Sequence, residues 1–253
     1  MKALITGAAH GLGRAMTEQL LENGHEVVAV DLDVDALDGL AIRSRGACMV
    51  RMADMAKPES LDRLVRALAG SKFDLVVLNA GISAVGKFED LPSKAQEKVV
   101  AVNLTAPIIL STMLVRESMM NRGSKMVFIS SLSKAVGYPG ASVYAATKDG
   151  IANYARNVRK PFKKRGVGIL TVFPGPIRTD HAERYSPPGA DAKKRMDPAK
   201  LATMILKAAA SRKKELWPGM TAQMGLAMGW FSQGLATRAM RKAIYDKLEE
   251  PKL

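Results

Sequence analysis

Three side chains between residues 131 and 148 have the types and spacing of an acid–base catalyst. Ser131 precedes Tyr144 by 13 residues, and Lys148 follows the tyrosine by four. Residues four apart lie on one face of a helix, so Tyr144 and Lys148 are expected to be neighbours. A tyrosine ordinarily titrates near pH ~10, and a neighbouring ammonium favours its phenolate and lowers that pKa. A hydroxyl such as Ser131 would then hydrogen-bond the substrate oxygen whose proton moves. Taken alone, the pattern also fits a solvated helix face.

A glycine-rich turn near the start of the chain is a candidate dinucleotide site. The apolar run KALIT leads into TGAAHGLG, which contains Gly7, Gly11 and Gly13, and a helical pattern then continues to Gly24. Glycines between a strand and a helix let the backbone approach a pyrophosphate at the positive end of the helix. The spacing differs from the usual G-x-G-x-x-G fingerprint, and a tight packing turn is the alternative interpretation.

Asp31 ends the next apolar run, EVVAVD, where a carboxylate can bind an adenosine ribose. Such a carboxylate accepts hydrogen bonds from the ribose 2′-hydroxyl and repels a 2′-phosphate, so the sequence favours NAD(H) over NADP(H). Arg14 and Arg43 are cations nearby in the sequence and keep NADP(H) open.

Strand and helix patterns alternate along most of the chain. Further apolar runs end near Asp54, Gly81 and Ser131, helical segments separate them, and GVGILTVFPG and ELWPG are candidates for a sixth strand and a short seventh one. This alternation predicts an α/β fold, with a Rossmann-type, doubly wound parallel sheet covered by helices on both faces.

No linker or repeat divides the sequence, so we expect a single domain. It would comprise a cofactor half over about residues 1–130, a catalytic and substrate half over about 131–217, and a C-terminal helical extension over about 218–253. The apolar fraction of 47% and the charged fraction of 25% are ordinary for a soluble globular protein.

Composition narrows the location and the partners. No run of 18 apolar residues occurs, so we expect no membrane-spanning helix, and a cytoplasmic location fits the single cysteine, Cys48, which we assign to a core strand. The formal charge of +14 is uneven, since residues 101–253 hold 26 Lys and Arg against 10 Asp and Glu. Such a surface attracts nucleic acid, anionic lipid or acidic substrates, but a solvated surface is favoured. No nucleic acid and no metal ion are expected as ligands.

By these residues the chain resembles the short-chain dehydrogenase/reductase family over residues 2–180. TGAAHGLG is similar to the cofactor glycine motif of that family, Asn79–Gly81 to its central-sheet motif, and PGPIRT at Pro174–Thr179 to its P-G motif. Asp54 matches the acidic residue that meets the adenine. The four residues that match its catalytic tetrad, in order, are Asn103, Ser131, Tyr144 and Lys148.

The resemblance implies an NAD(P)-dependent oxidoreductase that transfers a hydride between nicotinamide and a secondary alcohol or ketone. Tyr144 would be the general acid–base, Lys148 would lower its pKa and bind the nicotinamide ribose, and Ser131 would position the substrate oxygen. Asn103 would hold a water in a proton relay. Cofactor contacts are implied for Gly7, His10, Gly11, Leu12, Gly13, Asp31, Asp54, Met55, Asn79, Ala80, Gly81, Tyr144, Lys148, Pro174, Gly175, Ile177 and Thr179. The resemblance also implies a homodimer or homotetramer.

Some of the sequence departs from the family pattern. Pro161 lies in the helix after Lys148, where relatives often carry an acidic residue, so we expect a kink that places the usual helix–helix subunit contact in doubt. The loop after the P-G motif carries Lys193, Lys194 and Arg195. An acidic or phosphorylated substrate is one interpretation of these cations, and a solvated lid is the favoured one.

Two other functions stay open. One is a dinucleotide-binding regulatory or scaffold protein without catalysis, against which the complete tetrad argues. The other is a membrane-surface, NADP(H)-dependent lipid ketoreductase, because the uncharged segment 220–236 contains Trp230 and Phe231 and is followed by cations. Packing inside the protein or a dimer is favoured for this segment, since Gly225, Gly229 and Gly234 weaken a free-standing helix.

Overall fold

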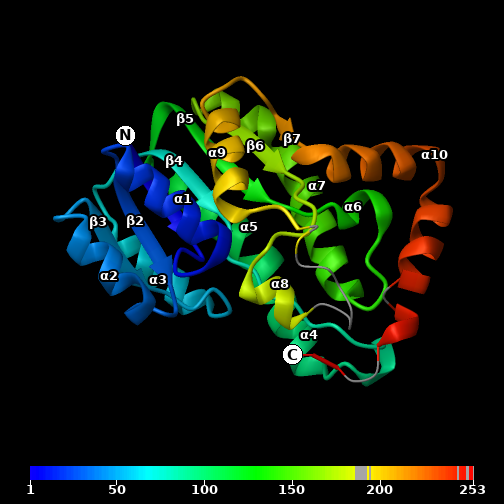
Figure 1. Cartoon of the computed structure of the whole chain (residues 1–253). Helices are drawn as coiled ribbons and strands as arrows, with labels where there is room; N and C mark the ends of the chain where they lie inside the picture. The colour runs from blue at the N-terminus through cyan, green and yellow to red at the C-terminus, as the bar shows by residue number, and fades with distance from the viewer. Residues whose placement is uncertain (186–192, 194, 244, 249–250, 253) are drawn as a thin grey trace.

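The computed structural model describes residues 1–185, 193, 195–243, 245–248 and 251–252 (Figure 1). Seven strands, all paired in parallel, form one sheet in the order β3-β2-β1-β4-β5-β6-β7. They are β1 (Lys2–Thr6), β2 (Glu26–Asp31), β3 (Cys48–Met52), β4 (Phe73–Leu78), β5 (Met120–Ile129), β6 (Gly168–Val172) and β7 (Glu215–Leu216). The predicted doubly wound sheet is confirmed, including its short seventh strand, and the strand order reverses between β1 and β4.

Helices cover both faces of this sheet. The described helices are α1 (Gly11–Glu22), α2 (Asp35–Arg43), α3 (Pro58–Ala67), α4 (Ser93–Val100), α5 (Ala106–Arg116), α6 (Ser133–Val136), α7 (Ser142–Lys164), α8 (Asp180–Arg184), α9 (Pro198–Ala209) and α10 (Gly219–Ala243). Short 3-10 turns lie at η1 (Phe88–Asp90) and η4 (Tyr245–Lys247), and the π-helical turn η2 spans Ala101–Thr105.

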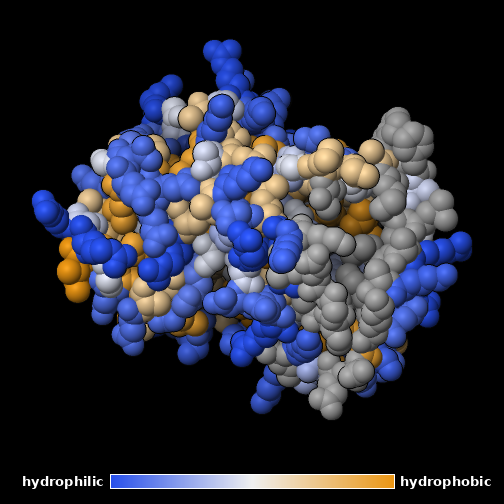
Figure 2. Space-filling view, in the orientation of Figure 1, coloured by the Kyte–Doolittle hydropathy of each residue, from blue (hydrophilic) through white to orange (hydrophobic). Residues whose placement is uncertain are grey.

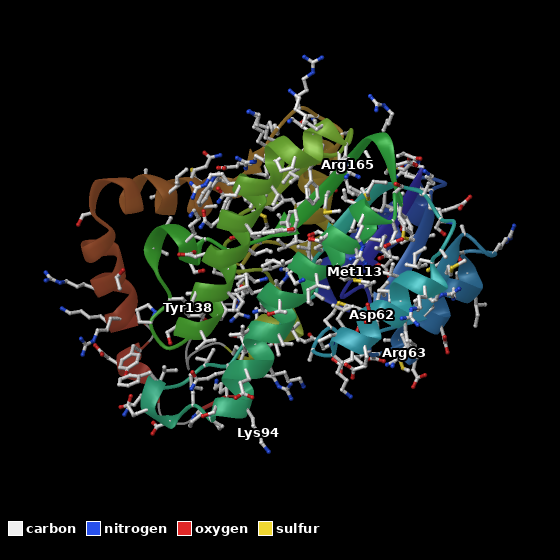
Figure 3. All side chains as sticks on the ribbon, turned by 180° about the vertical axis from the view of Figure 1, so that it is seen from behind. Asp62, Arg63, Lys94, Met113, Tyr138 and Arg165 are labelled. Atoms are coloured by element: carbon white, nitrogen blue, oxygen red, sulfur yellow. The ribbon has the colours of Figure 1, made fainter. Side chains whose placement is uncertain are left out.

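The hydrophobic core has one layer on each side of the sheet. Side chains alternate along a strand, so Ala3 and Ile5 face α1, α2 and α9, whereas Leu4 between them faces α3, α5 and α7. Figure 3 shows the second layer from behind, with Met113 on α5 and Asp62 on α3. Cys48 is buried in the first layer, as predicted.

One apolar helix in this core bears on the expectation that no helix spans a membrane. Helices α4 and α5 continue through η2 as one helical stretch, Ser93–Arg116, which is long and apolar enough to cross a membrane by length and composition alone. Because α5 packs on α3 and α7 and contributes Leu110 and Leu114 to the core, the stretch is a core helix here.

Helix α7 continues through Pro161 and ends at Lys164, so the proline does not end the helix. Proline has no amide hydrogen to donate to the Asn157 carbonyl, so α7 lacks one hydrogen bond there and still continues for three residues. The break in a long helix comes instead in α10, where Ser232 has the extended angles φ −163° and ψ 97°.

The C-terminal extension is helical, as expected, and folds back on the protein. Helix α10 packs on α6, and Val85, after β4, forms an antiparallel bridge with Lys252. This arrangement agrees with the favoured interpretation, packing inside the protein, although the side chains of Trp230 and Phe231 lie outside the described residues. Met220 and Met224 at the start of α10 are exposed by 77% and 66%. Figure 2 shows that hydrophilic residues cover most of the remaining described surface on this side.

Candidate active site

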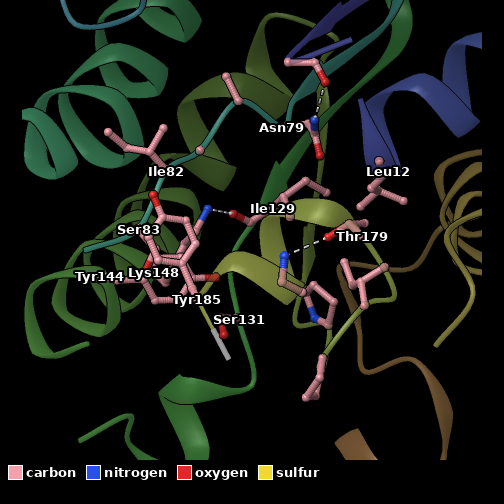
Figure 4. A pocket seen from close by; sticks show the side chains of 18 of the residues that line it. Leu12, Asn79, Ile82, Ser83, Ile129, Ser131, Tyr144, Lys148, Thr179 and Tyr185 are labelled. Atoms are coloured by element: carbon pink, nitrogen blue, oxygen red, sulfur yellow. Dashed lines mark hydrogen bonds between the residues drawn. The ribbon is translucent and has the colours of Figure 1, made fainter. Parts of the chain in front are cut away.

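A cavity of about 1550 Å³ lies at the carboxyl ends of the strands, beside the reversal of strand order between β1 and β4 (Figure 4). Ligands of doubly wound sheets bind at this position. The predicted site residues that line the cavity are Gly7, His10, Gly11, Leu12, Asp31, Asp54, Met55, Asn79, Ala80, Gly81, Ser131, Tyr144, Lys148, Pro174, Gly175, Ile177 and Thr179. Gly13 and Asn103 are not among the lining residues and support the site from behind.

The glycine turn is packed too closely for side chains. Gly7 has φ +66°, and a Cβ added there would lie 2.8 Å from the Ala80 Cα. A Cβ on Gly13 would lie 1.9 Å from the Gly7 carbonyl oxygen, and one on Gly11 would lie 2.9 Å from Thr179 Cγ2. Gly13 therefore serves packing, whereas Gly11 and Leu12 place the N-terminus of α1 at the cavity. That helix end fits a pyrophosphate.

Asp31 ties this turn to the end of β2. Its Oδ2 accepts a hydrogen bond from the Ala9 amide at 2.9 Å, and its Oδ1 accepts from the Leu32 amide at 2.7 Å and the Asp33 amide at 3.2 Å. Asp33 also pairs with His10, the Nε2–Oδ2 distance being 2.8 Å. Asp31 therefore places a carboxylate in the lining of the cavity, where it would repel an anionic group.

Arg14, the nearby cation that left NADP(H) possible as the cofactor, forms hydrogen bonds with other groups of the protein. Its Nε donates to Glu18 Oε1 at 2.9 Å, and one terminal nitrogen donates to the Ala36 carbonyl at 3.2 Å. A phosphate would have to compete with both partners for this guanidinium.

Asn79 braces the turn from β4. Its Nδ2 donates to the Thr6 and Gly7 carbonyl oxygens, each at 3.0 Å, and its own amide donates to Thr6 Oγ1 at 3.1 Å. The motif Asn79–Gly81 thus holds the central strands and the glycine turn in register. Asp54, after β3, accepts from the Ala56 amide at 2.9 Å and lines the cavity.

Lys148 lies one turn after Tyr144 in α7, as predicted, and is only 5% exposed. Its Nζ donates to the Ile129 carbonyl at 3.0 Å (Figure 4) and lies 5.6 Å from the centroid of the Tyr144 ring. Burial lowers the pKa of Lys148 from 10.5 to about 8. The ammonium is therefore still mostly charged at neutral pH.

The pKa of Tyr144 differs from the sequence-based expectation. Burial raises it from 10.0 to about 12, a hydrogen bond with Ser131 lowers it, and the charge of Tyr138 raises it. We expected Lys148 to lower this pKa, but in this structure the desolvation of the phenolate outweighs any such effect. At neutral pH the phenol is protonated and ready to donate.

Asn103 lies in the π-helical turn η2 and is 2% exposed. Its Oδ1 accepts from the Ile82 amide at 2.9 Å, and its Nδ2 donates to the Ile82 carbonyl at 2.8 Å and to Thr147 Oγ1 at 3.3 Å. These bonds fix the backbone at Gly81, where an added Cβ would lie 3.2 Å from Lys148 Nζ and 3.4 Å from Asn103 Oδ1. The water relay remains a prediction.

Sequence reasoning did not find several residues of the cavity. Tyr138 and Tyr185 line it near Tyr144, as does Ser133, whose buried Oγ has no hydrogen-bond partner among the described residues. Arg195 also lines the cavity, whereas Lys193 is exposed and Lys194 lies outside the described residues. The sequence shows a second tyrosine six residues before Tyr144. It does not show that this side chain lines the cavity.

Arg178 and Asp197 hold the loop that borders the cavity. Arg178 donates to Asp197 Oδ2 at 2.7 Å, and Asp197 Oδ1 caps α9 by accepting from the Ala199 and Lys200 amides at 2.9 and 3.1 Å. The ion pair between Arg178 and Asp197 joins the two ends of the segment between these residues, of which residues 186–192 and 194 are not described.

A doubly wound sheet, a glycine turn at its reversal point, and a half-buried tyrosine next to a buried lysine in one cavity are together typical of a Rossmann-type oxidoreductase. A family model described as short chain dehydrogenase matches residues 1–188. The chain belongs to this family, the short-chain dehydrogenases/reductases.

Comparisons with individual proteins agree with this family assignment. The chain is 30% identical over 188 residues to a 3-oxoacyl-[acyl-carrier-protein] reductase, FabG, of Escherichia coli, covering 73% of this chain and 76% of the relative. A solved short-chain dehydrogenase from Streptomyces avermitilis has a TM-score of 0.82 and 26% identity, covering 95% of this chain and 94% of that one.

Two further solved structures share the fold and contain a nicotinamide cofactor. A short-chain dehydrogenase from Sphingobium yanoikuyae in complex with NADPH has a TM-score of 0.77 and 24% identity, covering 96% of each chain. A 3-ketoacyl-(acyl-carrier-protein) reductase from Brucella melitensis with NADH has a TM-score of 0.73 and 23% identity, covering 85% of this chain and 95% of that one.

Proposed function

We propose that this protein is an NAD(P)-dependent oxidoreductase that interconverts a ketone and a secondary alcohol, with Tyr144 as the general acid–base. The observation that carries the proposal is a half-buried Tyr144 phenol with a pKa of about 12, hydrogen-bonded with Ser131 and close to the Lys148 ammonium, at a cavity of suitable size. A protonated phenol suits carbonyl reduction, and two of the similar proteins reported above are reductases.

In this mechanism the hydroxyl groups of Ser131 and Tyr144 hydrogen-bond the carbonyl oxygen of the substrate. The dinucleotide, when bound, supplies the hydride that adds to the carbonyl carbon. As negative charge develops on the oxygen, Tyr144 transfers its proton there and becomes a phenolate. The ammonium of Lys148 stabilises that phenolate electrostatically until solvent returns the proton.

The residues around the cavity fit a dinucleotide. Gly11 and Leu12 offer the helix N-terminus to the pyrophosphate, and Asp31 offers a carboxylate to the adenosine ribose. Lys148 would hydrogen-bond the nicotinamide ribose, and Thr179 with its preceding P-G motif would hold the carboxamide. Side chains on Gly7 and Gly11 would meet Ala80 and Thr179, so glycine at both positions lets the turn pack closely beside the cavity.

Within this function we propose that NAD(H) binds more tightly than NADP(H). Support comes from Asp31, which lines the cavity at the end of β2, and from Arg14, which is engaged by Glu18 and the Ala36 carbonyl. Asp31→Ala should narrow the ratio of the two dissociation constants, because it removes repulsion and ribose hydrogen bonds together. Fluorescence titration of NADH and NADPH measures the ratio, with Asp62→Ala on the exposed surface of α3 as a control of equal charge change.

Assays of secondary alcohols and ketones with NAD(H) and NADP(H) test the whole proposal. We expect oxidation of the reduced cofactor that depends on a ketone, and binding of at least one dinucleotide to the cofactor-depleted protein. If neither cofactor binds, the oxidoreductase proposal fails, and a wild-type preference for NADPH would overturn the role of Asp31.

The oligomeric state and the cellular location are also proposals. A homodimer or homotetramer in the cytoplasm agrees with family membership, and α7 keeps its helical course through Pro161, so a helix–helix subunit contact is sterically open. Light scattering of the purified protein gives the oligomeric state directly.

A further inference from the structure

The C-terminal extension contacts the substrate half of the protein through α6 and the loop after it. A Cβ added to Gly225 of α10 would lie 2.8 Å from Leu132 Cδ1. Further along α10, Thr237 donates from its hydroxyl to the Val136 carbonyl at 3.4 Å, and a Cβ on Gly137 would lie 3.1 Å from Thr237 Oγ1. The extension thereby fixes the segment that leads to Tyr138 (Figure 1).

The far end of the extension is held by the loop after β4. Val85 and Lys252 exchange two backbone hydrogen bonds, with N–O distances of 2.9 and 2.7 Å. Beside them, a Cβ on Gly86 would lie 3.2 Å from the Pro251 Cα. A reciprocal pair of this kind fixes which residue faces which, so it sets the path of the preceding turn η4 and of Leu248.

Leu248 is buried behind the tyrosines of the active site. It is 8% exposed and shares a hydrophobic cluster with Val85, Ala141 and Tyr185. The rings that pack against this cluster are those of Tyr138, Tyr144 and Tyr245. The described residues that line the cavity include Tyr138 and Tyr185 but not Leu248, so Leu248 acts on the cavity only through them.

Tyr138 and Tyr185 form a wall beside Tyr144, the proposed acid–base. The Tyr138 ring meets the Tyr144 ring edge-on, with centroids 6.1 Å apart and an interplanar angle of 89°. Tyr185, from the segment after α8, is 8% exposed and lines the same part of the cavity (Figure 4). Apolar lining is added by Leu132, Val136, Met196 and Met220.

We propose that Leu248 is a positioning residue that holds Tyr138 and Tyr185 as an aromatic wall, and that this wall selects ketones with a bulky apolar ring. The selectivity rests on the ketoreductase function proposed above. Aromatic faces bind flat apolar groups over a large area, whereas a small acyclic ketone leaves the wall uncontacted. Without Leu248 a cavity opens behind the rings, and they lose the support that fixes their orientation.

The test compares Leu248→Ala with Leu226→Ala, which makes the same change at a 40% exposed position of the same extension. KM and kcat are measured with tetralone as the ring ketone and butanone as the acyclic one, together with the dissociation constant of NADH. We expect Leu248→Ala to raise the KM for tetralone by about tenfold, while the KM for butanone and NADH binding change less than about twofold. Because Tyr144 packs on the same cluster, any change in kcat should be equal for the two ketones. Leu226→Ala should leave all four values unchanged. Equal KM changes for both ketones would overturn the selectivity.

A second measurement is independent of turnover. With fluorotyrosine incorporated and Tyr138 assigned through Tyr138→Phe, fluorine NMR follows the ring directly. Burial raises the pKa of Tyr138, so Leu248→Ala should lower it toward the ordinary value. The resonance of Tyr154, which lies on α7 and hydrogen-bonds with Ser111 of α5, should keep its chemical shift. An unchanged Tyr138 titration would overturn the positioning role. If no ketone is reduced by the wild type, the proposed function and the selectivity fail together, and the Tyr138 titration still decides the positioning.

Lys252→Pro changes the bridge to Val85 without changing any side chain of the hydrophobic cluster that contains Leu248. Proline lacks the amide that donates to the Val85 carbonyl, so one of the two bridge bonds is lost. We expect the same changes as for Leu248→Ala, but smaller. A Lys252→Pro protein with wild-type tetralone kinetics and an unshifted Tyr138 titration would mean that the bridge does not support the wall.

Discussion

Burial controls the protonation of Tyr144 and Lys148, the two side chains of the proposed catalytic pair. It raises the pKa of Tyr144 to about 12 and lowers that of Lys148 to about 8, so a neutral phenol faces a mostly charged ammonium at pH 7. This pair suits proton donation to a carbonyl oxygen. The reverse reaction needs the phenolate, which the buried site disfavours.

Tyr144→Phe should abolish turnover and leave cofactor affinity nearly intact. Only the phenolic oxygen moves the proton, whereas the ring packs against Tyr138 and remains in the variant. A loss of at least about a hundredfold in kcat is expected, measured beside the dissociation constant of NADH. Lys148→Ala is the comparison, because it should weaken both rate and cofactor binding. Near-normal rates for Tyr144→Phe would remove this tyrosine as the acid–base.

Lys148 should make the stability of the protein depend on pH. Its folded-state pKa of about 8 lies below the value of 10.5, so between these pH values the unfolded chain binds a proton that the folded chain has released. The free energy of unfolding therefore rises with pH from about 8 to about 10.5. Burial of the ammonium costs up to about 3 kcal/mol at pH 7, and this cost disappears across the window.

The measurement is urea denaturation of wild type and Lys148→Met at pH 7 to 10. The wild type should gain stability relative to the variant by about 2 kcal/mol over this range. The range stops at pH 10 because the raised pKa of Tyr144 lowers stability above that value. Two parallel pH profiles would contradict a lowered pKa for Lys148.

At the scale of elements, local sequence patterns predict the strands, the helices and the glycine turn. They do not predict properties that depend on contacts between residues far apart in the sequence. The seven strands and the glycine turn follow from apolar runs and local turn chemistry, and Tyr144 and Lys148 follow from helix periodicity. The raised pKa of Tyr144 could not be predicted, because its burial depends on Tyr138, Tyr185 and the end of the extension. The bonds from Asn103 to Ile82 depend equally on a π-helical turn, which no local pattern indicates.

The glycine turn gives a prediction about stability. Gly13→Ala would place a methyl group 1.9 Å from the Gly7 carbonyl oxygen, so the turn must open. We expect a loss of more than about 2 kcal/mol in the free energy of unfolding and weaker NADH binding. Gly39→Ala in α2 is the matched control, because that site is exposed and its nearest neighbour is the flexible end of Arg43.

The control should change stability in the opposite direction. Alanine loses less backbone entropy than glycine on forming a helix, which stabilises α2 by about 0.5–1 kcal/mol. Thermal and urea denaturation of both variants measure the two effects. A Gly13→Ala protein as stable as the wild type would mean that the glycine turn is less tightly packed than this structure requires.

Over the whole molecule, cations gather at the end opposite the active site. The first part of β5, the end of α7 and the turns that precede β6 and β7 meet there, since the Gly123 amide donates to the Gly166 carbonyl and Lys125 Nζ donates to the Ser211 carbonyl. Figure 3 shows Arg165 at this end, far from Tyr138. The exposed cations of these segments are Arg122, Lys163, Lys164, Arg165, Arg212, Lys213 and Lys214, and none forms an ion pair within the described residues.

This concentration of like charge should destabilise the protein at low salt. Exposed charges within a Debye length of about 10 Å at 0.1 M salt repel one another, and added salt screens that repulsion. We therefore expect the melting temperature to rise as NaCl increases from about 0.01 to about 0.2 M. Lys213→Gln should raise the free energy of unfolding by a few tenths of a kcal/mol at low salt and weaken the salt dependence. Arg116→Gln removes the same charge from a cation that pairs with Glu117 at 2.9 Å, so it should give no such gain. Equal stabilisation by both variants would show that net charge, rather than its concentration at this end of the sheet, sets the electrostatic cost.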